Sequence, residues 1–297
     1  MSLQHRASSV VQPALDELKK RRNPDGGFSL LLNNPSRPDV TAWALLALRS
    51  CGETGALVVE AGDYLKAYQQ ENGSVLMAEE ESAAVWITYV AAWAWEGMPE
   101  FEVCAKKALN YILSISGNWS YINAWGMAHD QSLKGWPWVA GTSSWVDSTA
   151  LALLALRSAG LEGHGRYVEG IKLLKNRELP SGGWNCGNTI VYGTELRPTP
   201  ESTAMALTLL DIRNARHVSS VQLLRQYLRP ATGPLTLAWG LMAIGTKKDL
   251  PVLEQVLVEQ QRDYCQTEWL SLLCMAWSFL TLSQGANVLG FPREGRL

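Results

Sequence analysis

The sequence predicts an all-α fold in which six helical hairpins close into an (α/α)6 toroid, with apolar helices inside and amphipathic helices outside. A tetrapeptide with an acid first, Thr third and Ala fourth occurs at 39–42, 147–150 and 201–204, and each copy opens an almost wholly apolar stretch. A helix that is apolar on every side has to be buried. These stretches alternate with amphipathic ones of helical period, and strand signals are sparse.

Each hairpin is expected to join one amphipathic helix to one apolar helix. The amphipathic helices are expected at 9–22, 57–71, 101–116, 167–178, 218–229 and 251–263. Their apolar partners are expected at 40–50, 82–95, 148–158, 202–213, 235–244 and 269–282. The last stretch lacks the polar face that caps a linear solenoid, which favours a closed ring. We expect one domain over 1–297, with an insertion at about 117–142.

Composition narrows the classes of function. The 297 residues are 47% hydrophobic and carry a net charge of −2, so a large core is expected and nucleic acid is not an expected partner. The five cysteines show no spacing typical of a disulfide framework or a structural zinc site. No apolar run reaches the roughly 20 residues that cross a bilayer. Without a signal-peptide pattern, a cytoplasmic location is expected.

Acids recur where the apolar helices are expected to begin. Five of the six starts carry one, and Pro234 stands at the other; the acids are Asp39, Glu81, Asp147, Glu201 and Glu268. One interpretation is structural: an acid at a helix N-terminus caps free backbone N–H groups and meets the positive end of the helix dipole, which stabilises the helix by about 0.5–2 kcal/mol. The other is functional: a closed ring brings these carboxylates to one end of its central cavity, where mutual repulsion raises pKa values and suits acid catalysis.

Tryptophan is the second candidate site component, with 13 Trp against 4 Phe. Aromatic faces stabilise carbocations and also stack on sugars, so the residue type leaves both uses open. The candidate substrate-binding residues are Trp43, Trp136, Trp138, Trp145, Trp184 and Tyr192.

Gly-aromatic turns give a family resemblance. The segments 23–28 and 180–184 resemble the turns of terpenoid cyclase and protein prenyltransferase toroids, including degenerate forms of the "QW" repeat, and 69–74 and 117–119 look like worn copies. The resemblance covers most of 9–282 and implies the toroid fold.

The acid tetrapeptide resembles a motif of class II triterpene cyclases within the same superfamily. Segment 146–150 is similar to their D-C-T-A context, and 37–42 is similar to their DxDD-T-A context, although Arg37 and Val40 replace flanking acids. In that family the Asp protonates an alkene or epoxide. The resemblance therefore implies that Asp147 is the proton donor, that Asp39 and Glu201 assist, and that Trp residues line an apolar pocket.

The prenyltransferase branch of the resemblance implies a zinc site built from Asp, Cys and His. Asp147, Cys186 and His129 are the available residues, but none stands in the expected motif, so no metal or other cofactor is expected.

Three functions remain open at this stage. The first is acid-initiated chemistry on, or binding of, an isoprenoid or other apolar small molecule in an aromatic-lined central cavity. The second is a carbohydrate-active lyase or hydrolase that uses a pair of the acids. The third is a non-catalytic toroid that binds a ligand or a protein partner.

Overall fold

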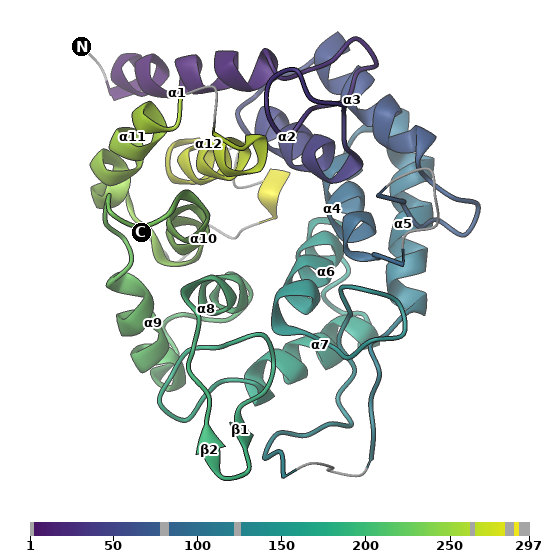
Figure 1. Cartoon of the computed structure of the whole chain (residues 1–297), viewed down its shortest axis with the longest axis vertical. Helices are drawn as coiled ribbons and strands as arrows, with labels where there is room; N and C mark the ends of the chain where they lie inside the picture. Colours follow the sequence, from purple (N-terminus) through teal and green to yellow (C-terminus); the bar gives the residue numbers. More distant parts are fainter. Residues whose placement is uncertain (1–2, 78–82, 122–125, 262–264, 283–287, 291–297) are drawn as a thin grey trace.

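The computed structural model describes residues 3–77, 83–121, 126–261, 265–282 and 288–290, and it is almost entirely helical (Figure 1). The apolar helices are α2 (Pro38–Ser50), α4 (Trp86–Trp95), α6 (Val146–Ser158), α8 (Pro200–Leu207), α10 (Pro234–Ile244) and α12 (Thr267–Thr281). The amphipathic helices are α1 (Leu3–Lys19), α3 (Ala56–Ala67), α5 (Glu102–Ser114), α7 (Gly165–Asn176), α9 (Val218–Arg225) and α11 (Leu250–Glu259). The prediction of an all-α fold is confirmed.

Shorter elements complete the described chain. Three 3-10 turns precede outer helices: η1 (Pro99–Phe101), η2 (Ala215–His217) and η3 (Lys247–Asp249). The one sheet among the described residues is a small antiparallel hairpin, β1 (Ile190–Val191) with β2 (Thr194–Glu195). No helix in the described part of the chain is both long and apolar enough to span a membrane.

The contacts between apolar helices run in a closed order. Helix α2 packs on α4, α4 on α6, α6 on α8, α8 on α10, α10 on α12, and α12 packs back on α2. The amphipathic helices lie around this inner set (Figure 1). The inner position follows from the sequence, because a helix that is apolar on every side has to be buried. In α2, every residue except Arg49 is buried.

The threonine of the repeated tetrapeptide ties each incoming turn to its helix. Thr41 Oγ1 accepts the backbone N–H of Phe28 at 2.8 Å, and Thr149 Oγ1 accepts that of Trp136 at 3.0 Å. The bond recurs in two further hairpins, from Val75 to Thr88 at 2.9 Å and from Trp184 to Thr203 at 2.9 Å. All four donor residues are fully buried. The tetrapeptide therefore fixes the register between a buried turn residue and the helix that follows it.

This bond also corrects the position of a predicted turn. The sequence suggested a worn Gly-aromatic turn at 117–119, but Trp136 forms the equivalent bond and Trp119 is exposed. Gly117 N donates to Gly135 O at 3.1 Å, so the residues that flank segment 118–134 are hydrogen-bonded to each other and belong to the same turn. A Cβ on Gly135 would lie 2.3 Å from Thr149 Oγ1, which explains the glycine. The insertion is thus an excursion from inside a Gly-aromatic turn.

Two other expectations differ from the structure. Helix α8 ends at Leu207, whereas the sequence predicted an apolar helix over 202–213; the chain turns at 211–214, where the Asp211 side chain accepts the backbone N–H of Arg213. The tetrapeptide acids are not N-caps either. The N-cap residues of α2 and α6 are Arg37 and Trp145, and the acids lie inside the first turn.

The described residues 288–290 pack at the far end of the inner helices. Leu289 is fully buried in the core cluster. A Cβ on Gly290 would lie 3.3 Å from Ser158 Cα, so this segment lies against the C-terminal end of α6 (Figure 1). The acids lie at the opposite end, where the inner helices begin.

Candidate functional site

The end of the ring at which the inner helices begin is called the acid end here. Each of four inner helices carries an acid in its first turn; these acids are Asp39, Asp147, Glu201 and Glu268. Glu81, the acid predicted for the second hairpin, lies outside the described residues. Trp86 holds the corresponding position in α4, two residues before Thr88 as Asp39 is two before Thr41. The acid end is therefore an interrupted ring of carboxylates.

On one side of the acid end, the carboxylate of Asp39 is neutralised. Arg37 Nη2 donates to Asp39 Oδ2 at 2.7 Å, and Arg37 Nε donates to Oδ1 at 3.1 Å. Glu268 of the neighbouring α12 is close enough to be influenced by both. Burial raises the pKa of Glu268, Asp39 raises it further, and Arg37 acts in the opposite direction. On this side, the arginine therefore compensates the charge of Asp39 and also acts on Glu268.

On the other side, Asp147 has no cationic partner among the described residues. Its Oδ1 is buried and has no hydrogen-bond partner there. Burial raises the pKa of Asp147 to about 6, the charge of Glu201 adds to the effect, and the Ser202 hydroxyl opposes it. Glu201 accepts a hydrogen bond from the Thr236 hydroxyl of α10. At a given pH near neutrality, a larger fraction of Asp147 is therefore protonated than of an ordinary aspartate.

The structure takes two predicted aromatic residues out of the candidate site. Trp136 and Trp184 are fully buried, and each donates its indole N–H at 2.7 Å to a backbone carbonyl, of Ile112 and of Leu174 respectively. The guanidinium of Arg166 covers the Trp136 ring at 4.3 Å. Both indoles lie between an inner and an outer helix, because they are the turn residues that Thr149 and Thr203 hold in place.

Trp43 lies inside the ring and helps to fill it. It meets Trp93 edge-to-face with ring centroids 6.3 Å apart, and it meets Trp239 at 6.1 Å. Helices α2 and α10 are separated in the ring by α12, so the contact between Trp43 and Trp239 runs across the interior. All three rings are buried. At this depth aromatic side chains occupy the interior, and they form a floor beneath the acid end.

The other predicted aromatics lie outside this floor. Trp138 packs edge-to-face on Trp86 with centroids 5.6 Å apart. Trp145 is 39% exposed and lines a pocket. Tyr192 is largely exposed in the turn between β1 and β2, and it does not line that pocket. Of the predicted aromatics, Trp145 is the one that lines this pocket, and it precedes Asp147 by two residues in the chain.

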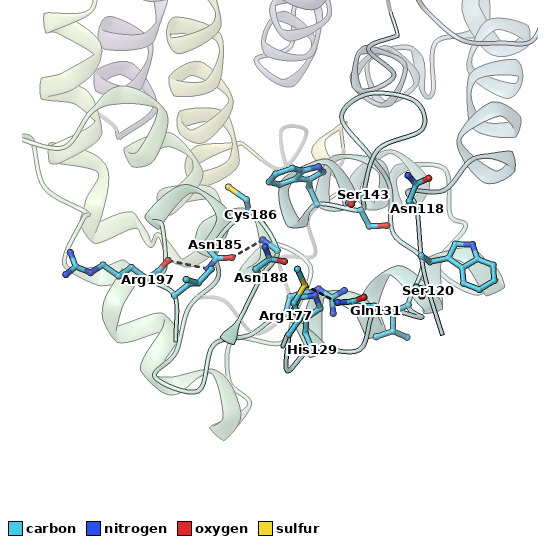
Figure 2. A pocket seen from close by; sticks show the side chains of 17 residues that line it. Asn118, Ser120, His129, Gln131, Ser143, Arg177, Asn185, Cys186, Asn188 and Arg197 are labelled. Carbon is cyan, nitrogen blue, oxygen red and sulfur yellow. Dashed lines mark hydrogen bonds between the residues drawn. The ribbon is translucent and has the colours of Figure 1, made fainter. Parts of the chain in front are cut away.

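The pocket next to Trp145 is called the polar pocket. It has a volume of about 680 Å³ and lies between the insertion, the end of α7 and the segment 185–197 (Figure 2). Its lining residues are Asn118, Trp119, Ser120, Met127, His129, Gln131, Leu133, Ser143, Ser144, Trp145, Arg177, Asn185, Cys186, Gly187, Asn188, Leu196 and Arg197. Sequence reasoning did not find Arg177 or Asn188, because a single Arg at a helix end and an Asn in a loop carry no pattern.

Cys186 links the polar pocket to Asp147. Its carbonyl accepts the backbone N–H of Val146 at 2.9 Å, which places it beside the first turn of α6. Burial and then the Asp147 charge raise the pKa of its thiol. Among the described residues, no group of three or more His, Cys, Asp or Glu side chains is arranged to hold a metal ion, so Asp147, Cys186 and His129 form no such group.

Comparison with solved structures shows what the fold resembles. A protein from Actinoplanes superposes with a TM-score of 0.58 at 20% identity, over 86% of this chain and 81% of that one. The type II terpene cyclase MstE from Scytonema, in complex with the product merosterolic acid A, gives a TM-score of 0.57 at 17% identity, over 87% and 81%. An MstE variant bound to its substrate, geranylgeranyl dihydroxybenzoate, gives 0.56 at 15%, over 87% and 80%.

These likenesses show that the chain has a terpenoid-cyclase-like fold, and at such identities they show the fold alone. No protein-family model matches the sequence, and no curated protein sequence matches it.

Proposed function

We propose that this protein is an (α/α)6 toroid of the terpenoid cyclase and prenyltransferase type, and that it binds an isoprenoid at the acid end and protonates it with Asp147. The observation that carries the proposal is the Asp147 carboxyl: an orphaned, buried oxygen and a pKa near 6, in the first turn of an inner helix. Such a group is partly neutral near pH 7, and the neutral form is the one that donates a proton.

The geometry suggests how the acid end would serve such a reaction. The substrate would approach past Trp145 and Cys186, which both line the polar pocket. Trp145 precedes Asp147 by two residues, and Cys186 is close enough for the Asp147 charge to raise the pKa of its thiol. Glu201 assists by keeping the Asp147 proton bound, because a second carboxylate raises the pKa of the first. Trp145 offers an aromatic face that stabilises the cation formed on protonation.

Asp39 has a different role in this proposal. Both oxygens of its carboxylate accept hydrogen bonds from Arg37, so we assign it an assisting role in shaping the acid end and assign the proton transfer to Asp147. The indole floor formed by Trp43, Trp93 and Trp239 closes the ring below the acids, so the substrate is held at the acid end and above this floor.

The test is an assay of cyclisation. Purified protein is incubated with geranylgeranyl dihydroxybenzoate, the compound bound by the MstE variant, and the extract is separated by liquid chromatography with mass detection. Cyclisation started by a proton and ended by loss of a proton leaves the mass unchanged, so a product of equal mass and altered retention is expected.

Variants decide whether Asp147 is the acid. Asp147→Asn should lower turnover by about 100-fold or more, the range by which a general acid contributes. Asp211→Asn, an exposed acid paired with Arg213, is the matched control and should leave turnover unchanged. Full activity in folded Asp147→Asn, or a wild-type protein that neither converts nor binds isoprenoid substrates of any head group, would overturn the proposal.

A further inference from the structure

The polar pocket has an unusual charge pattern. Its 17 lining residues include two arginines and a histidine but no acid, and the rest are divided evenly between amide or hydroxyl side chains and apolar or small residues. The acid end beside it carries four carboxylates among the described residues. Two adjoining regions of one molecule therefore have opposite electrostatic character, and each favours a different part of a ligand.

Arg177 is a buried cation without a counter-ion. Arg177 is the residue that directly follows α7, and it is only 6% exposed. No ion pair to it occurs in the described part of the chain. Its described hydrogen bonds all use Nη1, which donates to the Asp130 carbonyl at 3.0 Å and to Asn176 Oδ1. Nε and Nη2 remain available to a ligand. Burying an unpaired guanidinium is unfavourable, so a partner in the pocket is expected.

The nearest acid does not take that role. The Asp130 carboxylate, which is exposed, accepts hydrogen bonds from Ser132 N at 2.8 Å and from Ser132 Oγ at 2.7 Å. These two bonds are the main reason that the pKa of Asp130 is lowered, with Arg177 contributing less. Asp130 thus holds the loop in shape with its carboxylate and holds Arg177 with its carbonyl.

His129 is a second buried polar group with unmet bonding capacity. It is 5% exposed, and its Nδ1 has no hydrogen-bond partner within the described ranges. Figure 2 shows His129 and Arg177 together on one wall of the pocket, with the Asn188 side chain above them. Burial, followed by the charge of Arg177, lowers the pKa of His129 to about 4. At neutral pH it is an uncharged imidazole that has an N–H to donate.

Two other arginines, Arg49 and Arg225, show a purely structural use of the guanidinium group. Arg49 donates at 2.5 Å and 2.8 Å to the carbonyls of Ala94 and Glu96 at the end of α4. Arg225 donates at 2.9 Å to the carbonyl of Ile244 at the end of α10. Both complete the carbonyl ends of helices. Arg177 instead faces an open pocket of about 680 Å³ beside a second unsatisfied polar side chain.

We infer that the polar pocket binds an anionic group, a carboxylate or a phosphate, with Arg177 as the charged donor and His129 and Asn188 as neutral donors. Guanidinium groups pair with both anions through two parallel N–H bonds, which is why the residue types do not separate them. The inference rests on the proposed function in one respect: it takes the anion as the polar head of the same molecule whose isoprenoid chain reaches Asp147.

The experiment is a calorimetric titration of the full chain with inorganic phosphate, pyrophosphate, benzoate and dihydroxybenzoate, with benzyl alcohol as an uncharged match for benzoate. At least one anion should bind, and benzyl alcohol should bind at least 10-fold more weakly than benzoate if the carboxylate is the ligand. Preference for pyrophosphate identifies a phosphate head, and preference for a benzoate identifies a carboxylate head. Absence of binding by all four anions overturns the inference.

Variants assign the site. Arg177→Gln should weaken the preferred anion at least 10-fold, and His129→Gln should weaken it by a smaller factor. Arg49→Gln is the control: it removes another largely buried guanidinium, at the end of α2 and outside the polar pocket, and should bind the anion as the wild type does. If Arg177→Gln does not fold, Arg177→Lys and Asn188→Ala carry the test; unchanged affinity in all folded pocket variants overturns the inference. Asp147→Asn should keep anion binding while losing turnover, which separates this site from the proposed chemistry.

Discussion

Two starts of inner helices contain nearly the same tetrapeptide and yet hold their acids in opposite states. In α2, Asp39 is paired with Arg37 through two hydrogen bonds. In α6, Asp147 has a buried oxygen without a partner, and its pKa is raised to about 6. The residue two places before the acid makes the difference, since Arg37 in one hairpin corresponds to Trp145 in the other. A repeat thus conserves the bonds that build the hairpin and varies the neighbour that sets the charge.

The largest expected effect is that Asp147→Asn stabilises the protein at neutral pH. The folded pKa lies above the ordinary value of 3.8, so folding favours the neutral acid, and stability contributed by this group falls as pH rises from about 4 to above 6. Two pKa units correspond to about 3 kcal/mol as an upper bound. Urea unfolding at pH 7.5 should show most of this gain, and at pH 4 the variant and the wild type should unfold alike. A loss of stability at pH 7.5 would contradict the environment described for Asp147.

Arg37→Met should have the opposite sign. It leaves the buried Asp39 carboxylate beside Glu268 with no cation, and the cost is about 1–2 kcal/mol because Arg37 itself is partly exposed and screened by water. The same unfolding measurement at pH 7.5 checks it. Arg213→Met, which breaks an exposed pair with Asp211, should change the free energy of unfolding by less than about 0.5 kcal/mol.

Placing an arginine two residues before Asp147 should give this acid the charge pairing that Asp39 has. Trp145→Arg gives Asp147 the residue that Asp39 has, and the guanidinium should lower the Asp147 pKa by about one unit, the smaller end of the range for a nearby opposite charge because position 145 is partly exposed. Carboxyl NMR titration of the two proteins measures the change. Trp145→Gln separates charge from loss of the indole, and an equal shift in both variants would show that the guanidinium is not the cause.

The threonines should behave alike where the acids differ. Thr41→Val and Thr149→Val each leave one buried backbone N–H, of Phe28 or of Trp136, without its acceptor. Each substitution should lower the free energy of unfolding by about 1–2 kcal/mol, the cost of an unsatisfied buried donor. Chemical unfolding of both variants tests this equivalence. Costs that differ by much more than about 1 kcal/mol would show that the two bonds do not have the same structural role.

The sequence alone determined the all-α class, the order of the helices and the placement of acids at helix starts. Those properties are local: an apolar run without a polar face has to be buried, and the tetrapeptide repeats at visible intervals. The sequence also shows that Arg37 precedes one acid where Trp145 precedes the other. It did not show that the Trp119 turn belongs to an excursion, because Trp119 and Trp136 both follow a glycine closely and only the bond to Thr149 distinguishes them.

Only the tertiary structure decided which of these residues share a site. Trp136 and Trp184 look like binding residues in the sequence, but packing between two helices buries them and uses their N–H groups. Arg177 and His129 look unremarkable in the sequence, but the excursion from one turn brings them together in the polar pocket. Burial and charge pairing depend on residues far apart in the chain, so pKa values and unmet hydrogen bonds are properties of the folded molecule and of no single segment.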